Sequence, residues 1–150
     1  MIFLRRHALF RALVPLAVLP LLVACENSAT SMMIENKDHA LVLVREQPYF
    51  WSDKVEQYIV ASHLPDCQRR VKIHPDRAAM TPVVVYEADH LLWALNQGGR
   101  WYLASTEECL VHDWDNPGGQ PPGAVVGGFV QRNGKTVFTS YSTAPLPPGP

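Results

Sequence analysis

Apolar and polar residues alternate in short runs along most of the chain, and proline, glycine and asparagine separate these runs. A period of two is typical of strands that bury one face, and residues 69–74 show it. The runs at 39–46 and 83–86 are rich in β-branched and aliphatic residues, which also favours strands. Residues 53–63 are ambiguous, because a capping pattern at 53–56 favours a helix whereas aromatic and β-branched residues at 58–60 favour a strand. We predict a strand over 55–63. Further strands are expected at 69–74, 91–95, 100–105 and 109–114.

Two segments that contain glycine predict β-hairpins. Asn133-Gly134 lies between two β-patterned runs and fits a two-residue type I′ turn, in which Phe129 would oppose Phe138. Residues 96–99 are predicted as a four-residue connection, because their glycines can adopt positive φ. With seven to nine short strands and no helix pattern of sufficient length, the sequence predicts an all-β fold. The expected architecture is a single antiparallel β-sandwich or small barrel with at most one short helix.

Several segments are predicted to lie outside the core strands. Residues 26–38 are mostly small and polar and are predicted as a tether, with a short strand at 32–34 as the alternative. Residues 116–123 form a loop of proline and glycine, and residues 144–150 form an extended, proline-rich tail. The aromatic cluster at 49–51 is expected to pack in the core, because aromatic side chains bury large areas. Contact with a ligand is the alternative for this cluster.

The N-terminal segment has the order of charge and apolarity of an export signal. Arg5, Arg6 and Arg11 precede an apolar run from Ala12 to Ala24, and no acidic residue occurs before Cys25. The run is too short for a transmembrane helix, which needs roughly 18 or more apolar residues. We therefore expect a leader that is removed after export.

The leader ends in Leu22-Val23-Ala24-Cys25, which resembles the lipobox of bacterial lipoproteins. The resemblance implies that Cys25 becomes the first residue and carries acyl chains such as palmitate on its thiol and its new amine. Two or more such chains hold a protein on a bilayer almost permanently. Glu26 stands where inner-membrane lipoproteins often carry aspartate, which favours the periplasmic face of the outer membrane over the inner membrane. The implied organisation is a signal peptide at 1–24, a lipidated tether at 25–38, a β-rich periplasmic domain at 39–143 and the tail at 144–150.

Two cysteines remain once Cys25 is assigned to lipid. Cys67 and Cys109 form an even pair in an oxidising compartment, where disulfides form and persist, and we expect them to be bonded. In a chain-entropy treatment the loop that they close contributes about 4 kcal/mol to stability. The alternative is a tetrahedral zinc site, because His63 and His112 lie at suitable spacings from the two thiols and would complete a Cys₂His₂ set.

The distribution of charge narrows the classes of partner. The leader holds three of the thirteen basic residues and none of the fourteen acidic ones, so the remainder is acidic and nucleic acid is not an expected partner. One predicted strand nevertheless concentrates positive charge. We take this basic face as the candidate binding site for phosphates of an envelope polymer or for an acidic partner, with a solvated edge strand as the alternative. The residues of the basic face are Arg69, Arg70, Lys72, His74 and Arg77.

A catalytic set is not recognisable in the sequence. There is no G-x-S-x-G motif around a serine. Glu87 with Asp89, and Asp113 with Asp115, are carboxylate pairs that could act on a glycosidic bond or bind a cation, but solvated strand ends also explain them. The sequence therefore predicts a non-catalytic, membrane-anchored envelope lipoprotein without a cofactor. We expect a binding module that contacts an envelope protein or an anionic polymer in the periplasm, with metal binding through the Cys₂His₂ set as the alternative.

Overall fold

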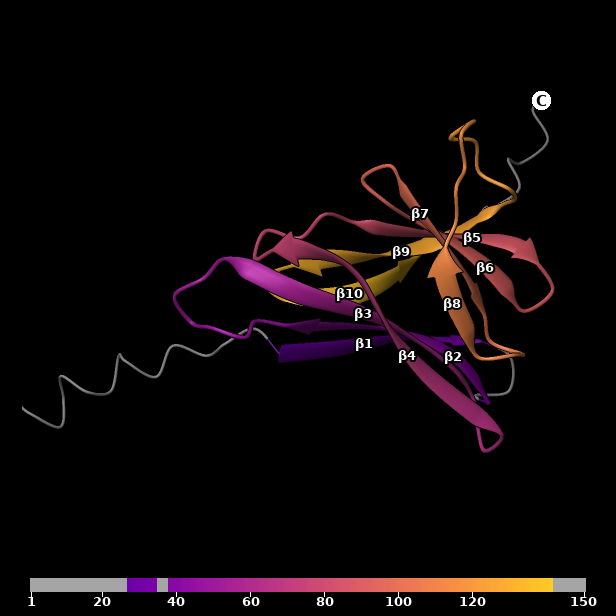
Figure 1. The fold of residues 1–150 in the computed structure, drawn as a ribbon, viewed down its shortest axis with the longest axis horizontal. Helices are drawn as coiled ribbons and strands as arrows, with labels where there is room; N and C mark the ends of the chain where they lie inside the picture. The colour runs from indigo at the N-terminus through magenta and orange to yellow at the C-terminus, as the bar shows by residue number, and fades with distance from the viewer. Residues whose placement is uncertain (1–26, 35–37, 142–150) are drawn as a thin grey trace, which may run out of the picture.

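The structure, a computed structural model, describes residues 27–34 and 38–141. In these ranges the chain forms ten strands and no helix, arranged as two antiparallel sheets (Figure 1). The predicted all-β class is confirmed. No helix within these ranges has the length and hydropathy that a membrane span requires. The four-stranded sheet contains, in spatial order, β1 (Asn27–Ile34), β2 (His39–Glu46), β3 (Lys54–His63) and β4 (Cys67–Arg77). The six-stranded sheet has the order β10-β9-β5-β6-β7-β8 and contains β5 (Val83–Asp89), β6 (Leu92–Gln97), β7 (Arg100–Ser105), β8 (Leu110–Asp113), β9 (Val125–Arg132) and β10 (Lys135–Ser140).

The core takes alternate residues from the strands of both sheets. Leu41 and Leu43 of β2 and Ile59 of β3 have no exposed surface, and Leu95 and Phe129 of the other sheet belong to the same cluster. Successive side chains of a strand point to opposite faces, which is why alternation in the sequence identifies these positions. Full burial of a side chain of this size contributes about 1.5–3 kcal/mol.

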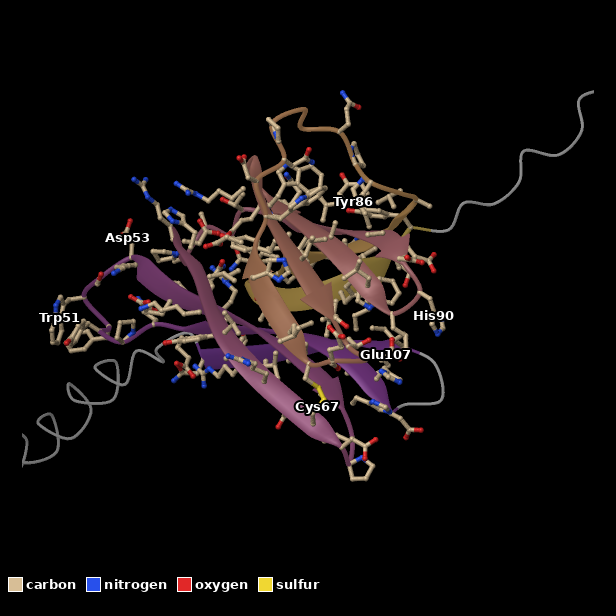
Figure 2. The ribbon with its side chains drawn as sticks, turned by 45° about the vertical axis from the view of Figure 1, so that its right-hand side comes forward. Trp51, Asp53, Cys67, Tyr86, His90 and Glu107 are labelled. Atoms are coloured by element: carbon tan, nitrogen blue, oxygen red, sulfur yellow. A yellow bond between two sulfur atoms is a disulfide. The ribbon has the colours of Figure 1, made fainter. Side chains whose placement is uncertain are left out.

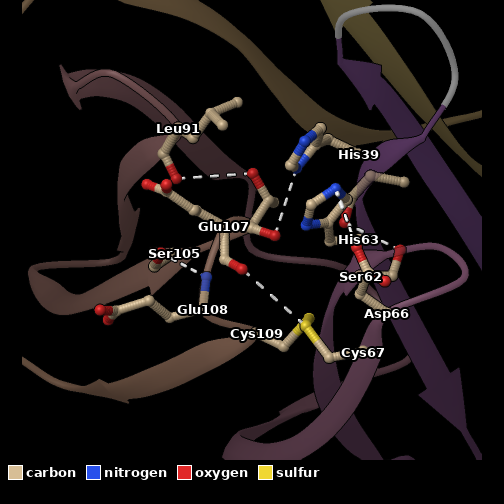
Figure 3. Close-up of a disulfide and its surroundings, with 12 residues drawn as sticks. His39, Ser62, His63, Asp66, Cys67, Leu91, Ser105, Glu107, Glu108 and Cys109 are labelled. Atoms are coloured by element: carbon tan, nitrogen blue, oxygen red, sulfur yellow. Dashed lines mark hydrogen bonds and ion pairs between the residues drawn. A yellow bond between two sulfur atoms is a disulfide. The ribbon is translucent and has the colours of Figure 1, made fainter.

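The two sheets are joined along both edges. On one edge, a disulfide links Cys67, the first residue of β4, to Cys109, which precedes β8, with a Cα–Cα distance of 6.0 Å (Figure 3). On the other edge, the hydroxyl of Thr30 on β1 donates to the backbone carbonyl of Thr136 on β10 at 2.9 Å. The predicted disulfide is confirmed. It closes the sandwich on the side where β4 and β8 would otherwise be free edges.

Residues 54–63 form a strand, as predicted for this ambiguous stretch. Every second residue from 55 to 61 has no exposed surface, which is the period of two of a strand. These residues are Val55, Gln57, Ile59 and Ala61. β3 pairs with β2 on one side and with β4 on the other. Pairing on both sides outweighs the weak local preference of a capping pattern for a helix.

Both predicted hairpins are present, one of them with a shorter turn. Asn133 and Gly134 have φ of 50° and 73°, the left-handed region that a type I′ turn requires, and Phe129 opposes Phe138 in the predicted register. Between β6 and β7 the predicted four-residue connection is wrong. The strands continue toward each other, and Gly98-Gly99 alone forms the turn, because both glycines have positive φ.

β4 is longer than the predicted strand and continues through Pro75 to Arg77. Pro75 has no N–H to donate, but β4 is an edge strand, and its pairing with β3 shifts register between Val55 and Gln57. Edge positions and bulges are the places where a strand accommodates proline. The predicted strand at 69–74 therefore continues past a bulge to Arg77.

β1 occupies residues that the sequence assigns to the tether. Its pairing with β2 runs from Asn27, opposite Glu46, to Ile34, and Met32 and Ile34 are buried. The tether prediction is wrong for this segment. Few of its side chains are apolar, so its local pattern resembles a linker, and pairing with β2 determines its conformation instead. The predicted signal peptide, the lipidation at Cys25 and the tail at 144–150 lie outside the described residues.

The aromatic cluster at 49–51 is exposed rather than packed in the core. Tyr49, Phe50 and Trp51 are 55%, 60% and 71% exposed. The prediction fails because the pairing of β2 with β3 ends at Glu46 opposite Glu56, which leaves the intervening residues beyond the end of the sheet. Figure 2 shows Trp51 projecting at this end of the molecule.

We expect replacement of both Cys67 and Cys109 by alanine to lower the free energy of unfolding by about 2–4 kcal/mol, because the bond closes a long loop in the unfolded chain. Urea denaturation of the variant and the wild type measures this difference. Reduced wild-type protein serves as the control and should lose the same amount. Equal stability of variant and oxidised wild type would show that the bond has no structural role.

Candidate functional site

Three large polar side chains are buried near the end of the sandwich that carries the β2–β3 loop. Arg45 follows Leu41 and Leu43 on the core face of β2, and Gln57 lies directly opposite Arg45 on β3, with neither polar side chain exposed. Gln97, the last residue of β6, is also buried, and its amide donates to the side-chain oxygen of Gln57 at 2.5 Å. Buried polar groups are tolerated where they are hydrogen bonded. These three residues form a polar layer between the two sheets.

The polar layer supports the end of β4. The guanidinium of Arg45 donates to the backbone carbonyl of Arg77 at 2.6 Å. The backbone N–H of the next residue, Ala78, donates to the carbonyl of Asp53 at 2.9 Å. The end of β4 is thus held both from the interior and from the start of β3.

An open cleft of about 520 Å³ lies at this end of the sandwich, with Gln97 of the polar layer in its wall. The other walls come from the start of β3, the end of β4, the loop that leads to β5 and the turn between β6 and β7. The cleft therefore lies between the two sheets and uses residues from both. The charged and titratable residues that line it are Asp53, Lys54, His74, Asp76, Arg77 and Arg100.

One of the two carboxylates in the cleft has a structural role. Asp76 accepts a hydrogen bond from the backbone N–H of Thr81 at 2.6 Å and another from the Thr81 hydroxyl at 3.2 Å. These bonds fix the loop between β4 and β5, which forms one wall. Asp76 keeps its negative charge, so the cleft contains two carboxylates, Asp53 and Asp76.

Positive charge exceeds negative charge among the remaining lining groups. Arg77 is exposed, and its Nε lies 4.0 Å from the carboxylate of Asp53, at the limit of an ion pair. Lys54 lies 2.9 Å from Glu56, which is outside the cleft. Arg100 follows the Gly98-Gly99 turn and forms no ion pair within the described part of the chain. Arginine is a fork-shaped donor suited to phosphate and carboxylate groups.

The structure places the residues of the predicted basic face in different surroundings. β4 is an edge strand, and Val71 and Ile73 pack against the core while the charged residues face outward. Arg70 lies 2.8 Å from Glu46 and 3.7 Å above the ring of Tyr58, so its charge is already engaged. Lys72 forms an ion pair with Glu56. Of the five predicted residues, only His74 and Arg77 line the cleft, while Arg69 is exposed outside it.

Glu56 neutralises part of the basic face because it binds two lysines. Hydrogen bonds from Lys72, and secondarily from Lys54, hold the pKa of the Glu56 carboxyl below its ordinary value. The same contact raises the pKa of Lys72. An anionic ligand at this part of β4 would have to displace a carboxylate that is already well placed.

The Cys₂His₂ set that the sequence offers as an alternative is not formed. Cys67 and Cys109 are bonded to each other, so neither supplies a thiolate ligand. His63 stacks on His39 with ring centroids 4.0 Å apart (Figure 3). His112 lies exposed on β8. Within the ranges that the structure describes, no group of three or more His, Cys, Asp or Glu side chains is arranged to hold a metal ion.

The two carboxylate pairs are separated by the sheet order. Glu87 and Asp89 are on β5, Asp113 is on β8, and β6 and β7 lie between these strands. Three strand spacings amount to about 14 Å, so the two pairs do not form one site. Joint action of the two members of a single pair stays a prediction. Asp113 and Asp115 line a second, smaller depression beside Trp114.

Comparison with protein-family models, curated proteins and solved structures found no match to this chain. Its fold and its site therefore have to be interpreted from their own residues. The fold is an all-β sandwich closed by one disulfide, and the site is a cleft of mixed charge. Three basic side chains, Lys54, Arg77 and Arg100, and two carboxylates, Asp53 and Asp76, line this cleft.

Sequence reasoning missed Lys54, Arg100 and the polar layer beneath the cleft. Lys54 and Arg100 each begin a strand, where a charged residue carries no particular signal. Gln57 and Gln97 stand at alternate strand positions whose side chains face the core. This spacing from their apolar neighbours is the signal in the sequence that could have revealed them. A polar residue in core phase near a strand end is usually taken as the end of the strand.

We expect Glu56→Gln to lower the free energy of unfolding at pH 7 by about 1 kcal/mol or less, since exposed ion pairs contribute little each. A carboxyl whose pKa is lowered by folding stabilises the folded state above its ordinary pKa, and this contribution is lost as the pH falls through the lowered value. The difference between variant and wild type should therefore shrink to nothing in acid. Urea denaturation across a series of pH values measures it.

Glu108→Gln provides the matched control for this experiment. Glu108 is exposed and forms no ion pair within the described residues. We expect its replacement to leave stability unchanged at every pH. A Glu56→Gln defect that persists undiminished in acid would mean that the charge of Glu56 is not its cause.

Proposed function

We propose that this chain is a non-catalytic lipoprotein of the bacterial envelope, anchored through acylated Cys25 on the periplasmic face of the outer membrane. Its β-sandwich acts there as a binding module. The cleft between the two sheets is the proposed binding site, and its ligand is a phosphate or carboxylate group of an envelope component. The proposed site is therefore one end of the predicted basic face, where Arg77 lines the same cleft as Arg100.

The Cys67–Cys109 disulfide is the observation that carries the proposal. Disulfides persist in secreted and periplasmic proteins and are rare in reducing compartments. A leader that resembles a lipoprotein signal would deliver the chain to such a compartment. The leader and the cysteine pair are two separate parts of the sequence, and both favour an oxidising compartment such as the periplasm.

The start of β1 gives further support to anchoring. Asn27 is the first residue of β1 and lies two positions after Cys25. Two residues of extended chain span at most about 7 Å. A lipid on Cys25 would therefore hold the sandwich directly against the membrane surface and not on a long tether.

The composition of the cleft favours an anionic ligand. Arg77 and Arg100 come from different sheets and line the same cleft. Of the two carboxylates that also line it, Asp76 is bonded to Thr81 and Asp53 lies 4.0 Å from Arg77. Two forked donors in one cleft suit a group with several oxygen acceptors, such as a phosphate. The module would act by contact, with no covalent chemistry required of these residues.

We expect metabolic labelling with a radioactive fatty acid to label the wild-type protein, because the thioether at Cys25 would carry acyl chains. Cys25→Ser should abolish the label and leave a precursor of higher mass. Cys67→Ser/Cys109→Ser is the matched control, since it removes the other two cysteines and should keep the label. A wild-type protein without label would disprove the anchor.

We expect Arg77→Ala/Arg100→Ala to weaken binding of a deacylated, phosphorylated lipopolysaccharide fragment by about tenfold, because hydrogen bonds to charged groups contribute the most in such sites. Titration calorimetry with the acylated protein in detergent measures the dissociation constant. Poly-glutamate, tested in parallel, separates a phosphate ligand from an acidic protein partner.

Arg69→Ala is the control for the cleft, since Arg69 is an exposed arginine of β4 outside it. Its replacement should leave binding unchanged. If Arg69→Ala weakens binding as much as the cleft variant does, the ligand contacts the outer edge of β4 and the assignment to the cleft is wrong.

A further inference from the structure

The loop between β2 and β3 exposes three consecutive aromatic side chains, Tyr49, Phe50 and Trp51 (Figure 2). Each is more than half exposed, and together they present roughly 300–400 Å² of surface, given that an aromatic side chain offers about 150–250 Å². Patches of this size on monomeric proteins are often functional. The three side chains lie outside the hydrophobic core, so packing of the fold does not explain their presence.

The loop holds these side chains in a defined arrangement. The ring of Trp51 stacks on Tyr49 at a centroid distance of 5.1 Å and meets the edge of Phe50 at 4.8 Å. The backbone N–H of Ser52 donates to the carbonyl of Tyr49 at 3.1 Å, and the Gln47 amide donates to the carbonyl of Ser52. The aromatic tip, defined as Tyr49, Phe50 and Trp51, is therefore presented by a hydrogen-bonded turn.

The aromatic tip lies at the same end of the molecule as the start of β1 (Figure 1). Asn27 pairs with Glu46, the last residue of β2, and the loop begins at the next residue. Paired residues of neighbouring antiparallel strands lie about 5 Å apart. Cys25 is at most about 7 Å of chain from Asn27, so the proposed lipid and the aromatic tip belong to one end of the sandwich.

We propose that the aromatic tip inserts into the interface of the bilayer that holds the lipid at Cys25. This inference rests on the proposed anchoring and adds the orientation of the domain. Tryptophan and tyrosine favour the headgroup level of a bilayer, where their apolar rings and polar groups are both accommodated. The lipid and the tip would then form two points of attachment, which fix the sandwich with β1 and β2 rising from the membrane.

Charge at this end is compatible with an anionic membrane surface. Thr136 bonds to Thr30 of β1, which places the neighbouring β9–β10 turn at the same end, and Arg132 and Lys135 are exposed on that turn. Basic residues next to a membrane attachment are attracted to anionic lipids. Asp53, the exposed acid nearest the tip in sequence, faces the guanidinium of Arg77.

A bilayer accounts for the tip better than a second copy of the chain does. A stable interface between two proteins needs about 800 Å² from each partner, and the three rings supply less than half of that area. Membrane attachment needs no further surface, because the acyl chains already hold the protein in place.

Fluorescence of Trp51 tests the insertion in the acylated full-length protein, reconstituted into vesicles of phosphatidylethanolamine and phosphatidylglycerol. Trp51→Phe supplies the background of the other tryptophans, and the difference between the two proteins reports Trp51 alone. We expect lipids with brominated acyl chains to quench this difference signal. On vesicles, aqueous iodide should quench this difference signal about threefold or more weakly than it quenches a free indole in the same buffer, as expected for an interfacial indole.

Two variants then distinguish an effect of the aromatic tip from an effect of any exposed apolar side chain. Tyr49→Ser/Phe50→Ser keeps Trp51 as the probe and should restore access of iodide on vesicles. Leu110→Ser is the matched control, because Leu110 is another exposed apolar residue, on β8, and its replacement should leave both quenching results unchanged. Circular dichroism verifies that each variant keeps the β fold.

The outcomes are distinguishable. Acylated, vesicle-bound protein whose Trp51 is open to iodide would disprove the insertion and leave the proposed anchor intact. Protection from iodide without quenching by brominated lipid would mean that a second copy of the chain covers the tip, which also disproves it. A purified protein whose mass shows no acyl chains would remove both the anchor and the insertion.

Discussion

One covalent bond determines how the two sheets of this protein close upon each other. The Cys67–Cys109 disulfide joins β4, the edge of the four-stranded sheet, to the residue before β8, the edge of the six-stranded sheet. On the opposite side the closure depends on side-chain hydrogen bonds such as that of Thr30 to β10. The apolar core between the sheets is small, so a bond that limits the unfolded chain supplies a large share of a net stability of about 5–15 kcal/mol.

A strand was predictable where its local sequence pattern and its pairing in the sheet favour the same conformation. Val83 and Val85 alternate with partly exposed residues on β5, and the turn at Asn133-Gly134 sets its own register, so sequence alone identifies these elements. The disulfide was predictable from the compartment that the leader implies. The ambiguous segment 53–63 became a strand because it pairs on both sides, which is information that local preference does not contain.

The failures have a common physical cause, which is that pairing register is a long-range property. Asn27–Ile34 has few apolar residues and becomes a strand only because β2 offers it an edge. The aromatic residues 49–51 satisfy every local condition for a core position, but the register of β2 with β3 ends at Glu46 and places them outside. The candidate cleft was partly predictable: Arg77 and His74 stand out by charge, while Arg100 reaches the same place from the other sheet and is visible only in three dimensions.

The end of the sandwich that carries the β2–β3 loop has a composition that matches the proposed orientation on a membrane. The opposite end, at the β3–β4 turn, is cross-linked by the disulfide and buries only the small polar side chains of Ser62 and Thr106. The end at the β2–β3 loop buries the larger polar side chains of Arg45, Gln57 and Gln97. A polar layer thus lies inside this end, and the aromatic tip lies outside it. At a bilayer surface, water, phosphate groups and acyl chains follow one another within a short distance. The polar layer, the charged cleft and the aromatic tip lie at the one end of the domain that would face these layers.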